Sequence, residues 1–143
     1  IGMDYTIKQI SDECTLRAVL NMCYSILGEH YEGLYSYEAW SRRLDRGYLM
    51  LYAEHGGEPI AAVLGRAESP DSAVIGFAAC IEKYRGRGIT KSLVQSFERS
   101  ARMHDYYRIT LTSFNGAWGF YEKCGYEVIE EKFGKRIYCK YLG

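Results

Sequence analysis

Proline and long apolar runs are both scarce in this 143-residue chain, which has two prolines and a net charge of zero. No apolar run approaches the roughly 20 residues that a membrane-spanning helix needs. Because 18 basic residues balance 18 acidic ones, no overall field favours nucleic acid or an anionic membrane surface. We therefore expect no nucleic-acid partner and no membrane partner.

Metal-binding and disulfide patterns are also missing. The five cysteines are odd in number and contain no C-x-x-C pair, so neither a disulfide framework nor a zinc site is indicated. His30, His55 and His104 are scattered along the chain without metal-ligand spacing. The N-terminus does not have the pattern of a signal peptide. These features predict a cytoplasmic protein with no metal.

The length fits one domain, residues 1–143, which can bury about two thirds of the surface exposed by its unfolded chain. The sequence contains no repeat, linker or low-complexity segment that would divide it. Ile1 and Gly2 precede Met3, and we interpret them as a remnant of cloning.

Hydrophobic periodicity and turn residues predict the element order βααββ(β)αβαββ. The resulting fold would be one mixed sheet with helices on both faces. Strands are expected at 5–10, 48–54, 60–66, 73–81, 108–114, 126–131 and 136–141. Helices are expected at 12–27, at 36–44 with an end at Gly47, at 89–105 and, as a short helix, within 115–126.

A glycine-rich segment, Tyr84-Arg85-Gly86-Arg87-Gly88-Ile89-Thr90, joins an apolar strand to an amphipathic helix. Two glycines at such a turn let backbone N–H groups approach a ligand closely, and the following helix start adds unsatisfied donors and a positive dipole end. Arg85 and Arg87 add positive charge where a diphosphate would lie. The segment therefore predicts an anion cradle.

Two better-known glycine loops do not fit this spacing. A P-loop ending at Lys91-Ser92 would need glycines at positions 85 and 90, which hold Arg85 and Thr90. A dinucleotide fingerprint starting at Gly86 would need a third glycine at Lys91. Both interpretations fail.

The spacing that does fit is Arg-x-x-Gly-x-(Gly/Ala), met by Arg85 and Gly88, with Thr90 in place of the last small residue. About thirty residues downstream, the segment 115–126 reads N-G-A-W-G-F-Y-E-K-C-G-Y. In order and spacing the two motifs resemble the signatures of the GNAT superfamily of N-acetyltransferases. The resemblance implies an α/β fold, with a mixed, mostly antiparallel central sheet and helices on both faces.

The resemblance also implies acetyl-CoA as the co-substrate. The glycine-rich segment would hold its pyrophosphate, and backbone groups at the end of the preceding strand would hold the pantetheine arm and face the thioester carbonyl. The expected contacts are Ala78, Ala79, Cys80, Arg85, Gly86, Arg87, Gly88, Ile89, Thr90 and Asn115.

For catalysis, the resemblance implies that Tyr121 is the general acid that protonates the departing CoA thiolate. In some family members a glutamate acts as the general base at the position where this chain has Val74. The remaining candidates for a base are Glu54, His55, Glu82 and Ser113, or a chain of water molecules, and we assign none.

The predicted activity is acetyl transfer from acetyl-CoA to a primary amine, by direct attack in a ternary complex. A small molecule is preferred to a protein as the acceptor, and the resemblance allows a homodimer. Carboxylates among tyrosines at 29–38, followed by Trp40, would favour a cationic amine, although the same segment reads equally well as a helix connection that caps the core. A catalytically silent acyl-CoA-binding module and a transferase of a longer acyl group, beside Ala78 and Ala79, are the alternatives. Burial explains Cys80 and Cys124 better than an acyl-cysteine intermediate.

Overall fold

The computed structural model describes residues 3–28, 33 and 36–143. Within these residues the strands form one sheet in the order β1-β2-β3-β4-β5-β7-β6. Every neighbouring pair is antiparallel except β4 and β5, which run parallel. The strands are β1 (Thr6–Gln9), β2 (Met50–His55), β3 (Glu58–Ser69), β4 (Ser72–Cys80), β5 (Arg108–Phe114), β6 (Glu127–Lys132) and β7 (Lys135–Tyr141). The predicted mixed and mostly antiparallel sheet is confirmed.

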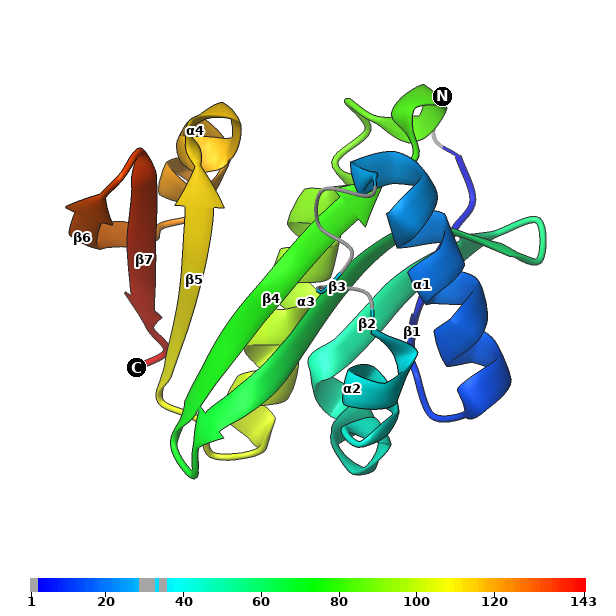
Figure 1. The fold of residues 1–143 in the computed structure, drawn as a ribbon, viewed down its shortest axis with the longest axis horizontal. Coiled ribbons are helices and arrows are strands. Elements are labelled where there is room, and N and C mark those ends of the chain that lie inside the picture. Colours follow the sequence, from blue (N-terminus) through cyan, green and yellow to red (C-terminus); the bar gives the residue numbers. More distant parts are fainter. Residues whose placement is uncertain (1–2, 29–32, 34–35) are drawn as a thin grey trace.

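Helices cover both faces of this sheet, as Figure 1 shows. On one face lie α1 (Glu13–Leu27) and α2 (Tyr37–Ser41), and on the other lies α3 (Ile89–Met103). The short α4 (Trp118–Lys123) follows β5. Short 3-10 segments are η2 (Leu44–Leu49), η3 (Glu82–Tyr84) and η4 (Asn115–Ala117).

Each face has its own hydrophobic core. Leu93 and Phe97 of α3 pack with Ile75 of β4 on one side, in a cluster that also contains Tyr121. Leu16 of α1 belongs to the cluster on the other side. The apolar side chains predicted to share one face of α3 are buried: Ile89, Leu93, Val94, Phe97 and Ala101. The 3.6-residue pattern therefore identified this core face from the sequence alone.

The predicted helix 36–44 is too long. Helix α2 ends at Ser41, and η2 follows after Arg43, whose φ of −107° and ψ of 8° leave the helical region. Gly47 lies inside η2, not at a helix end, and a Cβ there would come within 2.1 Å of the carbonyl oxygen of Ile10. The glycine is needed because η2 passes directly over the end of β1, a tertiary contact that the local pattern does not report.

No helix in the described part of the chain has the length and apolarity needed to cross a membrane. Among the same residues, no group of three or more His, Cys, Asp or Glu side chains could hold a metal ion. All five cysteines are free thiols. The predicted roles of Ile1-Gly2, and of most of the acceptor segment 29–38, fall outside the described residues.

Candidate active site

Strands β4 and β5 separate partway along their length (Figure 1). Their parallel pairing runs from Ser72 opposite Arg108 to Ile75 opposite Leu111 and goes no further. Beyond that point β4 stays paired with β3, and β5 stays paired with β7. The second half of β4 therefore has an open edge inside the sheet, where backbone groups lack a ladder partner.

The open edge begins at a β-bulge. The register between β3 and β4 shifts at Leu64 and Gly65, so that Gly76 is the extra residue of β4. A Cβ on Gly76 would lie 3.2 Å from the Leu64 carbonyl oxygen and 3.2 Å from the Trp40 ring. A side chain here would therefore have to displace the indole that packs against the strand by a few tenths of an ångström.

The register decides which backbone groups face the opening. In an antiparallel ladder, the N–H and C=O of alternate residues point to opposite sides of the strand. The Ile81 N–H donates to the Ile60 carbonyl oxygen at 2.9 Å, and the pairing continues without a shift from Cys80 to Phe77. Ala79 therefore directs its backbone groups toward β3, whereas Ala78 and Cys80 direct theirs toward the opening.

The glycine-rich segment follows β4 and ends at the first turn of α3. Gly86 and Gly88 have φ of 77° and 78°, values that residues other than glycine rarely adopt. Gly88 is the N-cap of α3, and no side chain caps the helix. The N–H groups of its first turn are consequently available to an external anion.

A pocket of about 400 Å³ lies between this segment and α4. Its lining includes Cys80, Arg85, Gly88 and Thr90 on one side and Phe120 of α4 on the other. The Arg85 Nε donates to the Cys80 carbonyl oxygen at 3.1 Å, which ties the loop back to the end of β4. Burial raises the pKa of the Cys80 thiol, while Arg85 and a hydrogen bond with Thr90 oppose that rise.

The second motif folds as η4 followed by α4. Asn115 lies exposed in η4, and Tyr121 is buried within α4 with 7% of its surface exposed. The Tyr121 ring packs edge-on against Phe120 and Tyr126. Burial, together with the nearby Cys124, raises the pKa of Tyr121 to about 12. The phenol therefore keeps its proton throughout the neutral range.

A buried carboxylate holds the C-terminal strands against α3. Glu98 accepts hydrogen bonds from the Tyr126 hydroxyl at 2.9 Å and from Lys140 Nζ at 3.0 Å. Lys140 also donates to the Cys124 carbonyl oxygen at 2.8 Å. These contacts join α3, β7 and the end of α4, and so they fix the position of the helix that carries Tyr121.

The sequence comparison agrees with this geometry. The acetyltransferase (GNAT) family matches residues 14–126, which include both motifs and the opening between β4 and β5. The chain belongs to the GNAT acetyltransferase family. Its enzyme class is therefore that of the acyltransferases. No curated protein sequence matches the chain.

Solved structures with the GNAT fold superpose on nearly the whole chain. PaiA N-acetyltransferase from Thermoplasma acidophilum, in complex with coenzyme A, is 18% identical with a TM-score of 0.79, covering 97% of this chain and 99% of that one. Ribosomal-protein-S18-alanine N-acetyltransferase from Escherichia coli is 14% identical with a TM-score of 0.80, covering 98% and 95%. Ard1 from Thermoplasma volcanium is 16% identical with a TM-score of 0.78, covering 96% and 97%. At these identities the likeness shows the fold.

The four candidates for a base do not gather in this GNAT structure. Glu54 pairs with Lys8 of β1 at 2.8 Å, and the Nδ1 atom of His55 contacts the Asp4 carbonyl oxygen. Glu82 lies exposed in η3. Ser113 is buried and donates to the Phe114 carbonyl oxygen at 3.1 Å. The structure thus brings the loop and α4 together around one pocket but does not bring any of these four side chains into it.

A second, smaller pocket of about 250 Å³ lies at the bulge itself. Trp40, Arg43, Arg66, Val74 and Gly76 are among its lining residues. The sequence reasoning did not single out Arg43 or Arg66. Arg43 lies between α2 and η2 and Arg66 lies in β3, more than twenty positions apart, and no local motif marks them.

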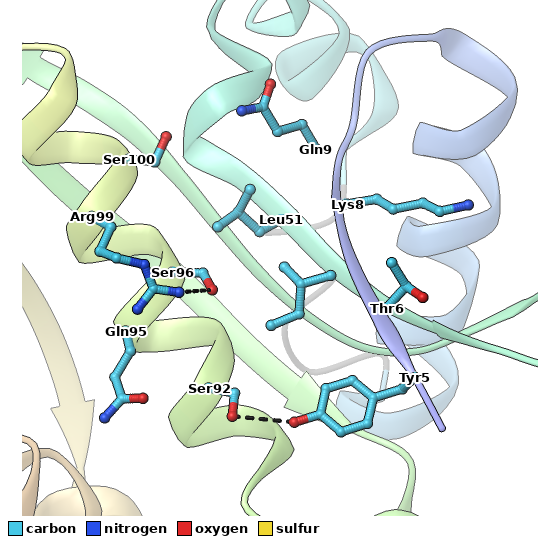
Figure 2. A pocket seen from close by; sticks show the side chains of 11 residues that line it. Tyr5, Thr6, Lys8, Gln9, Leu51, Ser92, Gln95, Ser96, Arg99 and Ser100 are labelled. Atoms are coloured by element: carbon cyan, nitrogen blue, oxygen red, sulfur yellow. Dashed lines mark hydrogen bonds between the residues drawn. The ribbon is translucent and has the colours of Figure 1, made fainter. Parts of the chain in front are cut away.

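A surface depression of about 680 Å³ lies elsewhere in this GNAT domain, between β1 and α3 (Figure 2). Tyr5 donates to the Ser92 Oγ across it at 3.1 Å, and Arg99 donates to the Ser96 Oγ on α3 at 3.0 Å. Its lining does not contain the glycine-rich segment, and Tyr121 lines neither this depression nor the pocket beside the glycine-rich segment. Its size alone does not make it the active site.

Proposed function

We propose that this chain transfers the acetyl group of acetyl-CoA to a primary amine of a small molecule, by direct attack in a ternary complex. One observation carries the proposal: β4 leaves β5 after Ile75, and its open edge leads from the bulge at Gly76 to the pocket at Gly88. The five residues from Gly76 to Cys80 span about 13 Å of extended strand. An extended acyl-thioester arm can lie along such an edge.

The glycine-rich segment would bind the diphosphate of acetyl-CoA. Arg85 and Arg87 provide charge, and the uncapped N-terminus of α3 provides backbone donors. Arg85 uses its Nε on Cys80, which leaves its two terminal nitrogens for the diphosphate. The PaiA structure, which holds coenzyme A on the same fold, supports acetyl-CoA as the co-substrate.

The open edge of β4 supplies the orientation of the thioester. The Ala78 and Cys80 N–H groups point into the opening, and the Cys80 carbonyl oxygen is already bonded to Arg85. A backbone N–H aimed at the thioester carbonyl stabilises the negative charge that grows on that oxygen during attack. Alternation along the strand places Ala78 and Ala79 on opposite faces, so the two do not widen one pocket together for a longer acyl group.

Tyr121 supplies the proton in the proposed reaction. The amine nitrogen forms a bond to the carbonyl carbon, the C–S bond breaks, and the sulfur takes the phenolic proton of Tyr121. The proton lost by the amine then returns to the phenolate through solvent. A phenol whose pKa is about 12 holds this proton at neutral pH until negative charge develops on the sulfur.

The free state of all five thiols supports a reducing compartment, and we infer a cytoplasmic enzyme. Proteins remain possible acceptors by analogy, because one structural neighbour is named for acetylation of an alanine of ribosomal protein S18. A pocket of about 250 Å³ at the bulge instead favours a small acceptor.

Calorimetric titration with acetyl-CoA, followed by thiol-release assays on a panel of amines, tests the proposal. We expect saturable binding and thiol release that depends on the amine. Binding without turnover on any amine would favour the silent acyl-CoA-binding module. Faster release from a longer acyl-CoA would favour the longer donor, and the absence of binding would overturn the assignment of the glycine-rich segment.

A further inference from the structure

The pocket at the bulge is bordered by two arginines that converge from different elements. Arg43 lies between α2 and η2, as the residue that precedes η2, and Arg66 comes from β3, where it pairs with Val74 of β4. Both line the same cavity of about 250 Å³ as Gly76, the first residue of the open edge. The two positive groups therefore lie where an acceptor would meet the thioester.

Neither arginine forms an ion pair with a described residue. The five ion pairs among these residues involve other cations: Lys8, Arg46, Arg136 twice and Lys140. The described lining of the pocket also contains no aspartate, glutamate or histidine. The cavity therefore has a positive potential that its own described side chains do not neutralise.

The position of Arg43 is fixed by packing. Its guanidinium lies over the Trp40 ring, with Cζ 4.3 Å from the ring centroid, and Trp40 in turn packs against Gly76. Burial lowers the pKa of Arg43, and the charge of Arg66 lowers it further. A stacked, partly desolvated guanidinium held near a second one is suited to binding an oxyanion, because the planar fork matches its two oxygens.

On this basis, and resting on the proposed acetyl transfer, we propose that the acceptor is a small amine that also carries a carboxylate or phosphate group. Arg43 and Arg66 bind that anionic group and leave the amine facing the open edge of β4 at Gly76. A polyamine would instead bring positive charge into a positive pocket. The carboxylates expected to attract one, at 29–38, lie largely outside the described residues.

The same charges answer the problem of the missing base. An amine must lose its proton before it can attack, and nearby positive charge disfavours the ammonium form. Lysines activated by a neighbouring cation work on this principle. A bound carboxylate neutralises one of the two positive charges, and the remaining one disfavours the ammonium form of the amine, which then loses its proton to solvent water.

Thiol release from acetyl-CoA with sets of related amines that differ in charge tests the inference. The first set is 4-aminobutyrate, 1-butylamine and putrescine, which differ only in the group at the far end. The second is 2-aminoethyl phosphate against ethanolamine, and the third is aspartate against asparaginamide. We expect kcat/KM to be at least about 10-fold higher for the anionic member of one or more sets, which also distinguishes carboxylate from phosphate. A preference for putrescine, or no preference in any set, would overturn the inference.

Charge reversal at Arg66 provides a second test of the inference. Arg66→Glu should lower kcat/KM for the preferred anionic amine by about 100-fold and raise it for putrescine, whereas Arg42→Gln, a change at an exposed neighbour outside the pocket, should leave both unchanged. Unchanged acetyl-CoA affinity in Arg66→Glu would show that the fold and the donor site are intact. An Arg66→Glu variant that keeps the wild-type preference would overturn the inference.

Failure of the proposed acetyl transfer can be distinguished from failure of the inference about the two arginines. If acetyl-CoA binds but no amine releases thiol, calorimetric binding of aspartate and 2-aminoethyl phosphate to the CoA-loaded protein still tests the arginine pocket. Binding that Arg66→Glu abolishes would support the inference and reject turnover. The absence of binding would overturn the inference while leaving acetyl-CoA recognition intact.

Discussion

Arg85 donates its Nε hydrogen to the carbonyl oxygen of Cys80 at 3.1 Å, so the loop that begins α3 is fastened to the end of β4. The two residues are separated by only η3 and its flanks, yet the bond sets the distance between the uncapped helix N-terminus and the open strand edge. One arginine thus joins the glycine-rich segment to the strand edge that we propose orients the thioester.

This bond predicts unequal roles for the two loop arginines. Arg85→Ala removes a charge and the link to β4, and we expect acetyl-CoA affinity to fall about 10- to 100-fold, the range of a charge-assisted hydrogen bond. Arg87→Ala removes an exposed charge and should cost about 2- to 5-fold. Calorimetry measures the acetyl-CoA affinity of both variants. Equal losses of affinity would show that the bond from Arg85 to Cys80 does not contribute to binding.

Tyr121→Phe separates binding from chemistry. Because the hydroxyl would act only when the thiolate leaves, kcat should fall about 10²- to 10⁴-fold, with acetyl-CoA affinity nearly unchanged. The phenol is the active, protonated form, and burial has moved its pKa upward from 10 to about 12. Loss of this proton should therefore not reduce kcat until the pH approaches 12.

The pH profile of kcat in the wild type, measured up to the pH at which the protein unfolds, tests whether the pKa of Tyr121 is shifted upward. A decline centred near pH 10 or below would place the titrating group elsewhere. Tyr141→Phe, at a tyrosine 65% exposed on β7, serves as the matched control and should keep wild-type turnover. A Tyr121→Phe enzyme with wild-type kcat would exclude the general-acid role.

Gly88→Ala tests whether this glycine is needed for close approach of the ligand in addition to the positive φ of the turn. At a φ of 78°, alanine should cost about 1–2 kcal/mol of folding free energy. Its Cβ meets no protein atom within 4 Å, so any larger effect on acetyl-CoA affinity would come from contact with the ligand. We expect that affinity to fall at least about 10-fold, because the methyl group obstructs close approach of the phosphate to the backbone.

Gly57→Ala is the control for this experiment. Gly57 lies in the turn between β2 and β3 with a φ of 81° and equally open space around its Cβ position. It should lose similar stability in urea denaturation but bind acetyl-CoA as the wild type does. Equal affinities for the two variants would show that Gly88 serves the turn alone.

Glu98→Gln tests the buried link between α3 and β7. The change leaves Lys140, which has 28% of its side chain exposed, without its ion-pair partner, and we expect about 2–3 kcal/mol of destabilisation. Lys140→Met should destabilise as well, and the double variant should be more stable than the sum of the single losses predicts. Urea denaturation measures all three, with Glu127→Gln on exposed β6 as the surface control. Additive losses would show that Glu98 and Lys140 act independently.

Two elements with a buried face followed directly from their local patterns. The strand predicted at 108–114 coincides with β5, and the helix predicted from 89 begins at Ile89. Helix 36–44 was predicted too long because its end depends on the contact between Gly47 and Ile10. Local periodicity carries no information about such a contact between distant segments.

The sequence by itself determined the glycine-rich turn and the family, because Gly86 and Gly88 adopt positive φ values that favour glycine and the motif at 115–126 is contiguous. Only the tertiary structure decided which groups face the opening. The separation of β4 from β5, the outward direction of Ala78 and Cys80, and the pocket shared by Arg43 and Arg66 depend on strand register and helix packing. These relations join residues far apart in the chain, and register and packing are properties of the assembled sheet, not of any one segment.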